Sequence, residues 1–349
     1  MKMLFAYLLT KGSTTYELFN AFKRNPMIDV AYLFQDLDIK NSIYSEKKRS
    51  VFSKIMNKIK LPLDTIALNK RLELYDFTDA DILFTVKGNT IKPWILAKIK
   101  QKYPHLKIIS WSQDDMIAWH NRSLYYTYGL KYYDLVVTQK SYNIKELKSI
   151  GVKNVLFQNK AYSKDVHKPC EDCSDIKDKA DVLFIGHFEE ERFEDMLFLA
   201  KNGIKVDVYG PAWQRYMNIE KNLVIHNKML SGSDYSNAIS CSKISLCFLR
   251  KINRDLQTSR SIEIQACGGF MIAERTEEHK KLFLEDEEAV FFETKEELFE
   301  KVFYYLNNEE KREIIAKNGY RRVKESNYSY DDRVDEIVEF IKRELLCVE

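Results

Sequence analysis

The residues whose types and spacing best suit ligand binding or catalysis lie in the run Asp255–Arg275, DLQTSRSIEIQACGGFMIAER. Thr258 and Ser259 are residue types that cap helix N-termini, so we expect a helix from Ser259 to about Cys267. Arg260 would stand in its first turn, where free backbone N–H groups and the helix dipole already favour an anion. The spacing therefore predicts a phosphate-binding helix terminus with a guanidinium beside it.

Two acids frame this helix start with the spacing Asp-x7-Glu. Glu263 follows Arg260 by about one helical turn, and its carboxylate can accept hydrogen bonds from a ribose diol. Asp255 precedes the helix and is the second candidate for binding sugar hydroxyls. The alternative is that Glu263 forms an ion pair with Arg260 on the helix surface, because such helical pairs are common.

The surrounding elements alternate between short apolar strands and helices along the whole chain, which predicts parallel sheets. In the stretch above, Gly268 and Gly269 end the helix and Phe270–Ala273 is a buried strand. The other predicted strands are Met3–Leu9, Ile28–Phe34, Asp81–Val86, Leu106–Ser110, Leu135–Thr138, Asn154–Phe157, Asp181–Ile185, Lys205–Tyr209, Leu223–His226, Ile244–Phe248 and Ala289–Phe292.

Length and composition favour two globular domains. The chain has 349 residues, 45% hydrophobic and 31% charged, with few Gly and Pro. We predict an α/β protein with an N-terminal Rossmann-like domain (1–165), a linker (166–180), a second Rossmann-like domain (181–328), and a C-terminal helix (329–349).

The wording S-R-S-I-E-I-Q-A-C-G-G-F-M-I-A resembles the spore-maturation (CgeB-like) branch of the GT-B glycosyltransferases, which is related to glycosyltransferase family 4. The likeness extends from Asp181 to about Ile341 and is looser before that. It implies the GT-B fold, with two Rossmann-like domains facing a central cleft and the C-terminal helix (329–349) crossing back to the N-terminal domain. It also implies metal-independent, retaining transfer from a nucleotide-diphosphate sugar to a glycan, lipid-linked or protein acceptor. Asp255 stands where the family has Glu.

The resemblance also assigns roles to residues outside the helix. Arg192 follows the turn Gly186-His187 and would reach the donor diphosphate with Arg260 and the N–H groups of Thr258 and Ser259. Gly12, in the first strand-to-helix turn, would let the backbone approach a ligand. The predicted donor-binding residues are Gly12, Gly186, His187, Arg192, Thr258, Ser259, Arg260 and Glu263; the predicted catalytic residues are Asp114, Asp115, His120 and Asp255.

Each assignment has a structural alternative. Asp114 and Asp115 follow a strand and would act as acceptor groups, or as the general base of an inverting enzyme, but an acidic helix start is equally consistent. His120 is favoured as a surface residue over a role in holding the donor sugar. Arg192 has an ion pair with Asp195 as its alternative, and Gly12 a plain tight turn.

No metal cofactor is expected. The two D-x-D triplets, Asp36–Asp38 and Asp79–Asp81, lie beside predicted strands and are interpreted as turn acids. Cys170 and Cys173 form a lone C-x-x-C inside the linker; without a second pair or a further complete ligand set, two solvent-side thiols are favoured over a zinc or redox site. Cys241, Cys247 and Cys267 lie in apolar surroundings and are expected to act as small hydrophobes, which favours a cytoplasmic location.

The segment Lys40–Arg71 is the most basic part of the chain and carries an apolar helical stripe. We expect this helix to pack on its own domain, with peripheral contact at an anionic membrane surface as the second hypothesis. Net charge is +3, too balanced to indicate nucleic-acid binding. For function, the alternatives to a glycosyltransferase are a catalytically inactive nucleotide-sugar-binding or assembly protein and a GT-B nucleotide-sugar epimerase.

Overall fold

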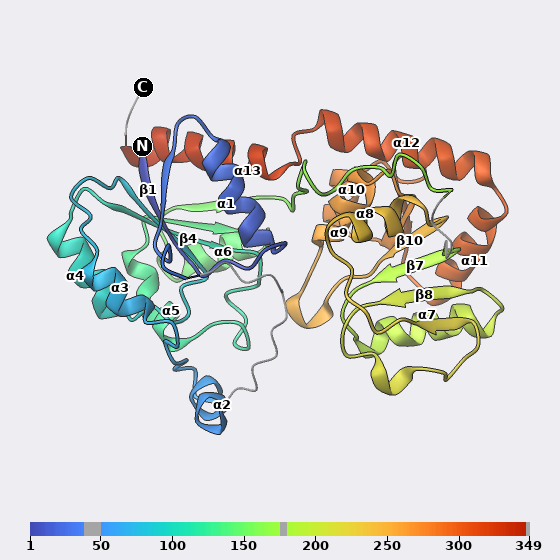
Figure 1. Ribbon diagram of the computed structural model, residues 1–349, viewed down its shortest axis with the longest axis horizontal. Coiled ribbons are helices and arrows are strands. Elements are labelled where there is room, and N and C mark those ends of the chain that lie inside the picture. Colours follow the sequence, from blue (N-terminus) through green and yellow to red (C-terminus); the bar gives the residue numbers. More distant parts are fainter. Residues whose placement is uncertain (38–49, 175–179, 347–349) are drawn as a thin grey trace. The chain divides into compact units, whose positions relative to one another are not determined.

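The computed structural model describes residues 1–37, 50–174 and 180–346 (Figure 1). The chain divides into two compact units. Residues 160–329 form the second unit, and the described residues before and after them form the first. The two units are described separately.

The first unit is built on a six-stranded sheet with the order β2-β1-β3-β4-β5-β6, in which every pairing is parallel. Its strands are β1 (Lys2–Ala6), β2 (Asp29–Tyr32), β3 (Ile82–Val86), β4 (Lys107–Ser112), β5 (Leu135–Thr138) and β6 (Val155–Phe157). Its helices are α1 (Thr14–Arg24), α2 (Val51–Lys58), α3 (Leu68–Leu74), α4 (Pro93–Lys102), α5 (Leu124–Gly129), α6 (Asn143–Ser149) and α13 (Tyr330–Phe340), with short turns Leu130–Tyr132 and Ile341–Leu346.

Continuous apolar runs explain why the central strands are covered on both faces. All five residues of β3 are buried, and the rings of Phe5, Phe22 and Phe84 pack together between the sheet and α1. The C-terminal helix α13 packs on α1 in this unit, where Arg24 forms an ion pair with Asp331.

The second unit repeats the pattern with the strand order β12-β11-β10-β7-β8-β9, again all parallel. Its strands are β7 (Val182–Ile185), β8 (Val206–Tyr209), β9 (Leu223–Ile225), β10 (Ile244–Cys247), β11 (Met271–Glu274) and β12 (Val290–Phe292). Its helices are α7 (Glu190–Lys201), α8 (Gly232–Ser240), α9 (Ser259–Ala266), α10 (Glu277–Leu282), α11 (Lys295–Leu306) and α12 (Glu309–Glu325), with short turns Gln214–Tyr216 and Lys251–Asn253.

All twelve predicted strands are present, mostly with ends moved by one to three residues. The expectation for Lys40–Arg71 is wrong in one respect: α2 has no buried residue, so its apolar stripe does not pack on its own domain. Residues 40–49 of that segment lie outside the described residues.

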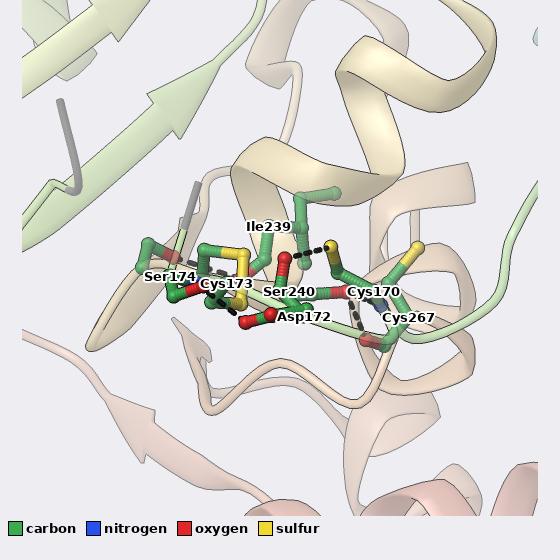
Figure 2. Close-up of a disulfide and its surroundings, with 9 residues drawn as sticks. Cys170, Asp172, Cys173, Ser174, Ile239, Ser240 and Cys267 are labelled. Carbon is green, nitrogen blue, oxygen red and sulfur yellow. Dashed lines mark hydrogen bonds between the residues drawn. A yellow bond between two sulfur atoms is a disulfide. The ribbon is translucent and has the colours of Figure 1, made fainter. Parts of the chain in front are cut away.

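The cysteine prediction also needs correction. Cys173 and Cys241 form a disulfide that spans 68 residues, so Cys241 is not a free apolar side chain and Cys173 is not a free thiol (Figure 2). Cys170 of the C-x-x-C is the member that stays free.

None of the helices in the part of the chain that the structure describes is both long and apolar enough to cross a bilayer.

Candidate functional site

A capping box stabilises the N-terminus of α9. The Thr258 side chain accepts from the backbone N–H of Ser261, and the Ser261 hydroxyl accepts from the backbone N–H of Thr258, with an N···O distance of 3.0 Å. Thr258 is therefore the N-cap, as predicted. Its own N–H is used inside the box, which corrects the expectation that it would bind a phosphate; the N–H groups of Ser259 and Arg260, in the first turn, are the ones left for an anion.

A buried histidine, His279, forms a hydrogen bond with the Ser261 hydroxyl of this capping box. His279 is fully buried, and its Nδ1 lies 2.6 Å from the carbonyl oxygen of Glu274, which can only accept, so Nδ1 carries the proton. Burial lowers the pKa of His279, so the ring is neutral and its Nε2 accepts from the Ser261 hydroxyl at 2.7 Å. The result is one directed chain of hydrogen bonds from Thr258 to β11, which holds the helix start rigidly.

Two guanidinium groups converge in front of this helix start. Arg192 from α7 and Arg260 from α9 both lie over the ring of Phe184, with Cζ 5.8 and 5.9 Å from its centre. Arg192 is only 3% exposed. It donates to the carbonyl oxygen of His187 and lies 3.6 Å from a Glu189 carboxylate oxygen. The predicted alternative, an ion pair with Asp195, is not formed.

Both arginines keep donors that no described residue accepts. Nε and Nη2 of Arg192 and Nε of Arg260 are buried without a hydrogen-bond partner among the described residues. Burial, followed by the charge of Arg260, lowers the pKa of Arg192 to about 10. Arg192 is buried and Arg260 is partly exposed, and Glu189 is the carboxylate that lies near Arg192. Like charges with unused donors are costly when they are removed from water, and a bound polyanion would reduce that cost.

The local field around this pair is strongly positive. Burial lowers the pKa of His187, and the charges of Arg250, Arg260 and Arg192 lower it further. The sequence analysis brought forward three of these four residues but missed Arg250. Arg250 follows β10 and forms an ion pair with Glu189 at 2.8 Å. Nothing in its sequence neighbourhood marks it, because only the folded sheet brings the ends of β7 and β10 together.

The packing of the Phe184 ring, over which the two arginines lie, requires glycine at position 186. A Cβ on Gly186 would lie 2.6 Å from the Phe184 ring, and its carbonyl oxygen accepts from the indole N–H of Trp213 at 2.9 Å. A Cβ on Gly210, which has φ of +143°, would lie 2.0 Å from the same carbonyl oxygen. The turns after β7 and β8 can therefore pack in this way only with glycine at both positions.

A cavity of about 340 Å³ lies beside Arg192, between α7 and the ends of β10, β11 and β12. Its lining carries six acidic and four basic side chains, and one of the lysines, Lys251, forms an ion pair with Glu274. Burial, followed by the charge of Glu274, raises the pKa of Asp195 to about 6. The mixed charges of this lining make the cavity a poorer match for a diphosphate than the arginine pair over Phe184.

Glu263 is held by partners that the sequence analysis did not identify. The Tyr235 hydroxyl donates to its Oε2 at 2.7 Å, and Nε2 of His167 lies 3.9 Å from its Oε1. The expected alternative of a surface pair with Arg260 is wrong, because the Glu263 side chain is 14% exposed and Arg260 is directed over Phe184. Burial, followed by the charge of Glu263, raises the pKa of Tyr235, which keeps its hydroxyl proton on the donor side.

His167 belongs to a segment that is fastened to α8 and α9. Ser236 donates to the carbonyl oxygen of Val166 at 2.6 Å, and the Cys170 N–H donates to the Ser240 hydroxyl at 3.0 Å. The Cys173–Cys241 disulfide ties the end of the segment to the end of α8, as Figure 2 shows. We call residues 163–173 the strap; part of what was predicted as a linker is thus a wall of the Glu263 site.

Asp255 lies in the loop that leads to α9 and accepts from the Asn253 side chain at 2.7 Å. Arg254, just before it, has the left-handed φ of +48°. The next part of the loop is anchored by the buried Gln257, which bonds the Glu278 carboxylate and the backbone N–H of Lys160. The Asp255 side chain is partly exposed.

The two predicted acids of the first unit have different environments. Asp115 is fully buried, and its Oδ1 accepts from the N–H groups of Ile117 and Ala118 and from the Asn143 side chain. These contacts give Asp115 a structural role, and its catalytic role stays a prediction. Asp114 remains 23% exposed and forms an ion pair with Lys87, at the end of the neighbouring strand β3. Lys87 was not anticipated.

The other predicted residues of this unit are either exposed or bound by structural partners. His120 is exposed, in agreement with the favoured surface interpretation, and Gly12, with φ of +77°, forms an exposed turn before α1. Asp36 is bound by both terminal nitrogens of Arg71, and Asp81 accepts from the N–H of Lys2, so these D-x-D acids are structural. Asp38 lies outside the described residues.

Comparison with known proteins places this geometry in a fold. A model of the glycosyl transferase-like family matches residues 191–339. Sucrose-phosphate synthase from Thermosynechococcus elongatus superposes with a TM-score of 0.70 at 13% identity, over 100% of this chain and 99% of that one. The fold is GT-B. Anabaena HepE in complex with UDP and glucose gives a TM-score of 0.66 at 11% identity, over 98% and 100% of the two chains.

A third GT-B structure is an α-glucosyltransferase in complex with UDP and DNA, with a TM-score of 0.61 at 15% identity, over 97% of this chain and 99% of that chain. At these identities the likeness establishes the GT-B fold alone. The DNA complex means that the fold by itself does not exclude a nucleic-acid partner, so the expectation of none rests only on charge balance. A search of curated proteins gives no match.

Proposed function

We propose that the protein is a glycosyltransferase that takes a sugar from a nucleoside diphosphate donor. The observation that carries this proposal is the pair Arg192 and Arg260, both over Phe184, with unused donors at the N-terminus of α9. Such a pair matches the geometry and charge of a diphosphate. The UDP and sugar complexes of GT-B neighbours support the donor class.

The arginine pair also supplies the chemistry that the transfer requires. As the glycosyl–phosphate bond breaks, negative charge grows on the leaving diphosphate. Arg192, Arg260 and the N–H groups of the first turn of α9 stabilise that charge, more strongly in the transition state than in the bound donor. Fixed cations do here what a bound metal does elsewhere, so the proposed transfer is independent of metal.

Glu263 and Asp255 complete the donor site in this proposal. Glu263 keeps acceptor lone pairs beyond its bond to Tyr235 and would hold the ribose diol. Asp255 would bind hydroxyls of the transferred sugar. The proposed stereochemical outcome is retention, as the resemblance to the spore-maturation (CgeB-like) branch and to family 4 implies, and the acceptor is a glycan, a lipid-linked sugar or a protein.

Calorimetry with purified protein tests the donor site. We expect UDP, or one of GDP, CDP, dTDP and ADP, to bind with micromolar affinity, and the Arg260→Ala variant to lose at least about tenfold. Arg321→Ala removes an exposed arginine on α12 and serves as the matched control, with unchanged affinity. Equal affinity of wild type and Arg260→Ala would reject the site; absence of binding by all five nucleotides would reject the donor class.

Two observations favour a second function, a nucleotide-sugar-binding protein without transfer. The Asp115 carboxylate already accepts hydrogen bonds from two backbone N–H groups. The Asp255 side chain is one methylene shorter than the family's Glu. Sugar release from the bound donor distinguishes the two: transfer to an acceptor, or slow hydrolysis in its absence, supports the enzyme. Tight binding with no turnover over any acceptor supports the binding protein, and isomerised nucleotide sugar without acceptor supports an epimerase.

A further inference from the structure

Helix α2 presents an apolar stripe to solvent. Val51, Phe52, Ile55 and Ile59 are 74%, 61%, 53% and 51% exposed, and none of the helix residues is buried. The four side chains follow the spacing of one helix face. In Figure 1 the helix stands apart from α3, α4 and α5. A contiguous apolar surface of this kind indicates a binding partner.

The charges around the stripe have one sign. Lys54 and Lys58 border it along one side, and both are exposed. Lys60 follows directly. Residues 50–63 contain no Asp or Glu, so no carboxylate of this segment neutralises the lysines. The partner of this face therefore has to be both apolar and negatively charged.

Exposed aromatic side chains continue the surface beyond the helix. The backbone carbonyl of Lys60 accepts from Leu124 at the start of α5, and the Lys60 ammonium lies 5.3 Å from the ring centre of Trp119. Trp119 is 60% exposed, and Tyr128 on α5 is 66% exposed. Lys60 thus links the end of α2 to Trp119 and to the start of α5, the helix that carries Tyr128.

A second tryptophan extends the same edge. Trp94 at the start of α4 is 52% exposed, packs edge-to-face on Tyr125 of α5, and has the Lys92 ammonium 5.3 Å from its ring centre. Asn89 bonds the loop before α5, which fixes the two tryptophan-bearing segments to each other. Residues 82–113 and 116–133 contain no Asp or Glu.

We propose that α2 and this aromatic edge form a docking surface for an anionic phospholipid bilayer, with Val51, Phe52, Ile55, Ile59, Trp94, Trp119 and Tyr128 as its apolar part. An amphipathic helix with bordering lysines inserts its apolar face at the level of the headgroups. Tryptophan and tyrosine prefer the same depth, and lysines gain from the negative surface potential. The inference stands on the first unit and goes beyond the proposed sugar transfer, since it states where the protein works.

Vesicle co-sedimentation of the full chain tests the docking surface. We expect binding to vesicles of phosphatidylcholine with phosphatidylglycerol, much weaker binding to phosphatidylcholine alone, and loss of binding at high salt. Phe52→Ser with Ile55→Ser should weaken binding to the anionic vesicles by at least about tenfold. Lys54→Gln with Lys58→Gln should weaken it by about tenfold and reduce its dependence on salt.

Matched control variants distinguish binding through this surface from nonspecific hydrophobic or electrostatic binding to vesicles. Phe303→Ser with Ile314→Ser removes two exposed apolar side chains of the second unit, and Lys201→Gln with Lys221→Gln removes two exposed lysines there. Both control variants should bind vesicles like wild type. The α2 residues are exposed, so all variants should unfold at the wild-type temperature.

Three results would overturn the proposal. One is no binding to anionic vesicles at low salt; another is binding that the two α2 variants leave unchanged. The third is that wild type forms a dimer, the Phe52→Ser and Ile55→Ser variant is a monomer, and neither binds vesicles, because the stripe would then join two copies of the chain. UDP binding in the same variants is read separately and should be unchanged, so failure here leaves the donor site standing.

Discussion

The guanidinium groups of Arg192 and Arg260 share one aromatic platform, the ring of Phe184, although they come from helices α7 and α9. Arg192 is buried and keeps two donors without a partner among the described residues. The protein holds two like charges over one ring, and the Glu189 carboxylate, 3.6 Å from Arg192, forms no hydrogen bond with the unused donors. Such an arrangement trades stability for binding.

One substitution should therefore raise the stability of the free protein and lower its affinity for the ligand. Arg192→Met removes a buried charge and unused donors, so the free protein should become more stable by about 1 kcal/mol, a melting temperature roughly 2–4 °C higher. Affinity for the nucleoside diphosphate should fall by about two orders of magnitude. Thermal unfolding and calorimetry measure the two effects.

Arg312→Met is the control for this prediction. Arg312 is also buried, but its Nη1 donates to the carbonyl oxygens of Tyr305 and Leu306. Its loss should destabilise the protein by about 1–3 kcal/mol and leave nucleotide affinity unchanged. If Arg192→Met instead lowers the melting temperature as much as Arg312→Met does, the charge at Arg192 is not a cost that a ligand relieves.

Different fragments of the donor should separate the roles of Glu263 and Arg260. Glu263→Gln should weaken UDP binding by about tenfold but leave inorganic pyrophosphate binding unchanged, because the carboxylate is proposed to bind sugar hydroxyls. Arg260→Ala should weaken both ligands. Competition calorimetry with UDP and pyrophosphate measures this. Equal losses for both ligands in Glu263→Gln would mean that Glu263 acts only through the shape of the helix start.

His187 predicts a specific dependence on pH. Burial and then the arginines hold its folded pKa below the usual value, so its contribution to stability is lost as pH falls through about 6.5, where the unfolded chain takes up a proton. A bound diphosphate raises that pKa, and binding then takes up a proton. Between about pH 8 and about pH 6, UDP affinity of wild type should rise relative to His187→Gln by up to about tenfold.

Using the ratio of the two affinities removes the titration of UDP itself, which is the same for both proteins. A ratio that stays constant over this range would show that His187 does not face the bound phosphates. Unfolding by denaturant at the same pH values gives the independent check of the stability sign.

The sequence predicted well what neighbouring residues decide. Thr258, the helix after it and the turn at Gly268 follow from local capping chemistry, and the twelve strands follow from short apolar runs. It predicted poorly what distant residues decide. Asp115 has the form of a catalytic acid, but Asn143 reaches it from α6 and buries its carboxylate, 28 positions along the chain.

The partners of Glu263 were missed for the same reason. Tyr235 arrives from α8, and His167 from a segment that composition marks only as a linker. The disulfide joins Cys173 to Cys241 across 68 residues, and cysteine spacing alone does not select that pair from the six cysteines present.

The disulfide predicts an ordered series of stabilities. Closing a loop of 68 residues is worth up to about 4 kcal/mol of unfolded-chain entropy. In Cys173→Ser the free Cys170 can replace the lost partner, because the sulfurs of Cys170, Cys173 and Cys241 lie within 4.8 Å of one another. In Cys241→Ser only the short Cys170–Cys173 bridge remains, and it closes no long loop.

Under oxidising conditions the loss of stability should therefore be largest for Cys241→Ser, smaller for Cys173→Ser and absent for Cys170→Ser. Denaturant unfolding with and without reductant measures the series, and full reduction should make the three variants alike. Because the strap carries His167 to Glu263, Cys241→Ser should also weaken UDP binding by several-fold while pyrophosphate binding is kept. Equal stabilities of Cys173→Ser and Cys241→Ser would mean that Cys170 does not exchange into the bond.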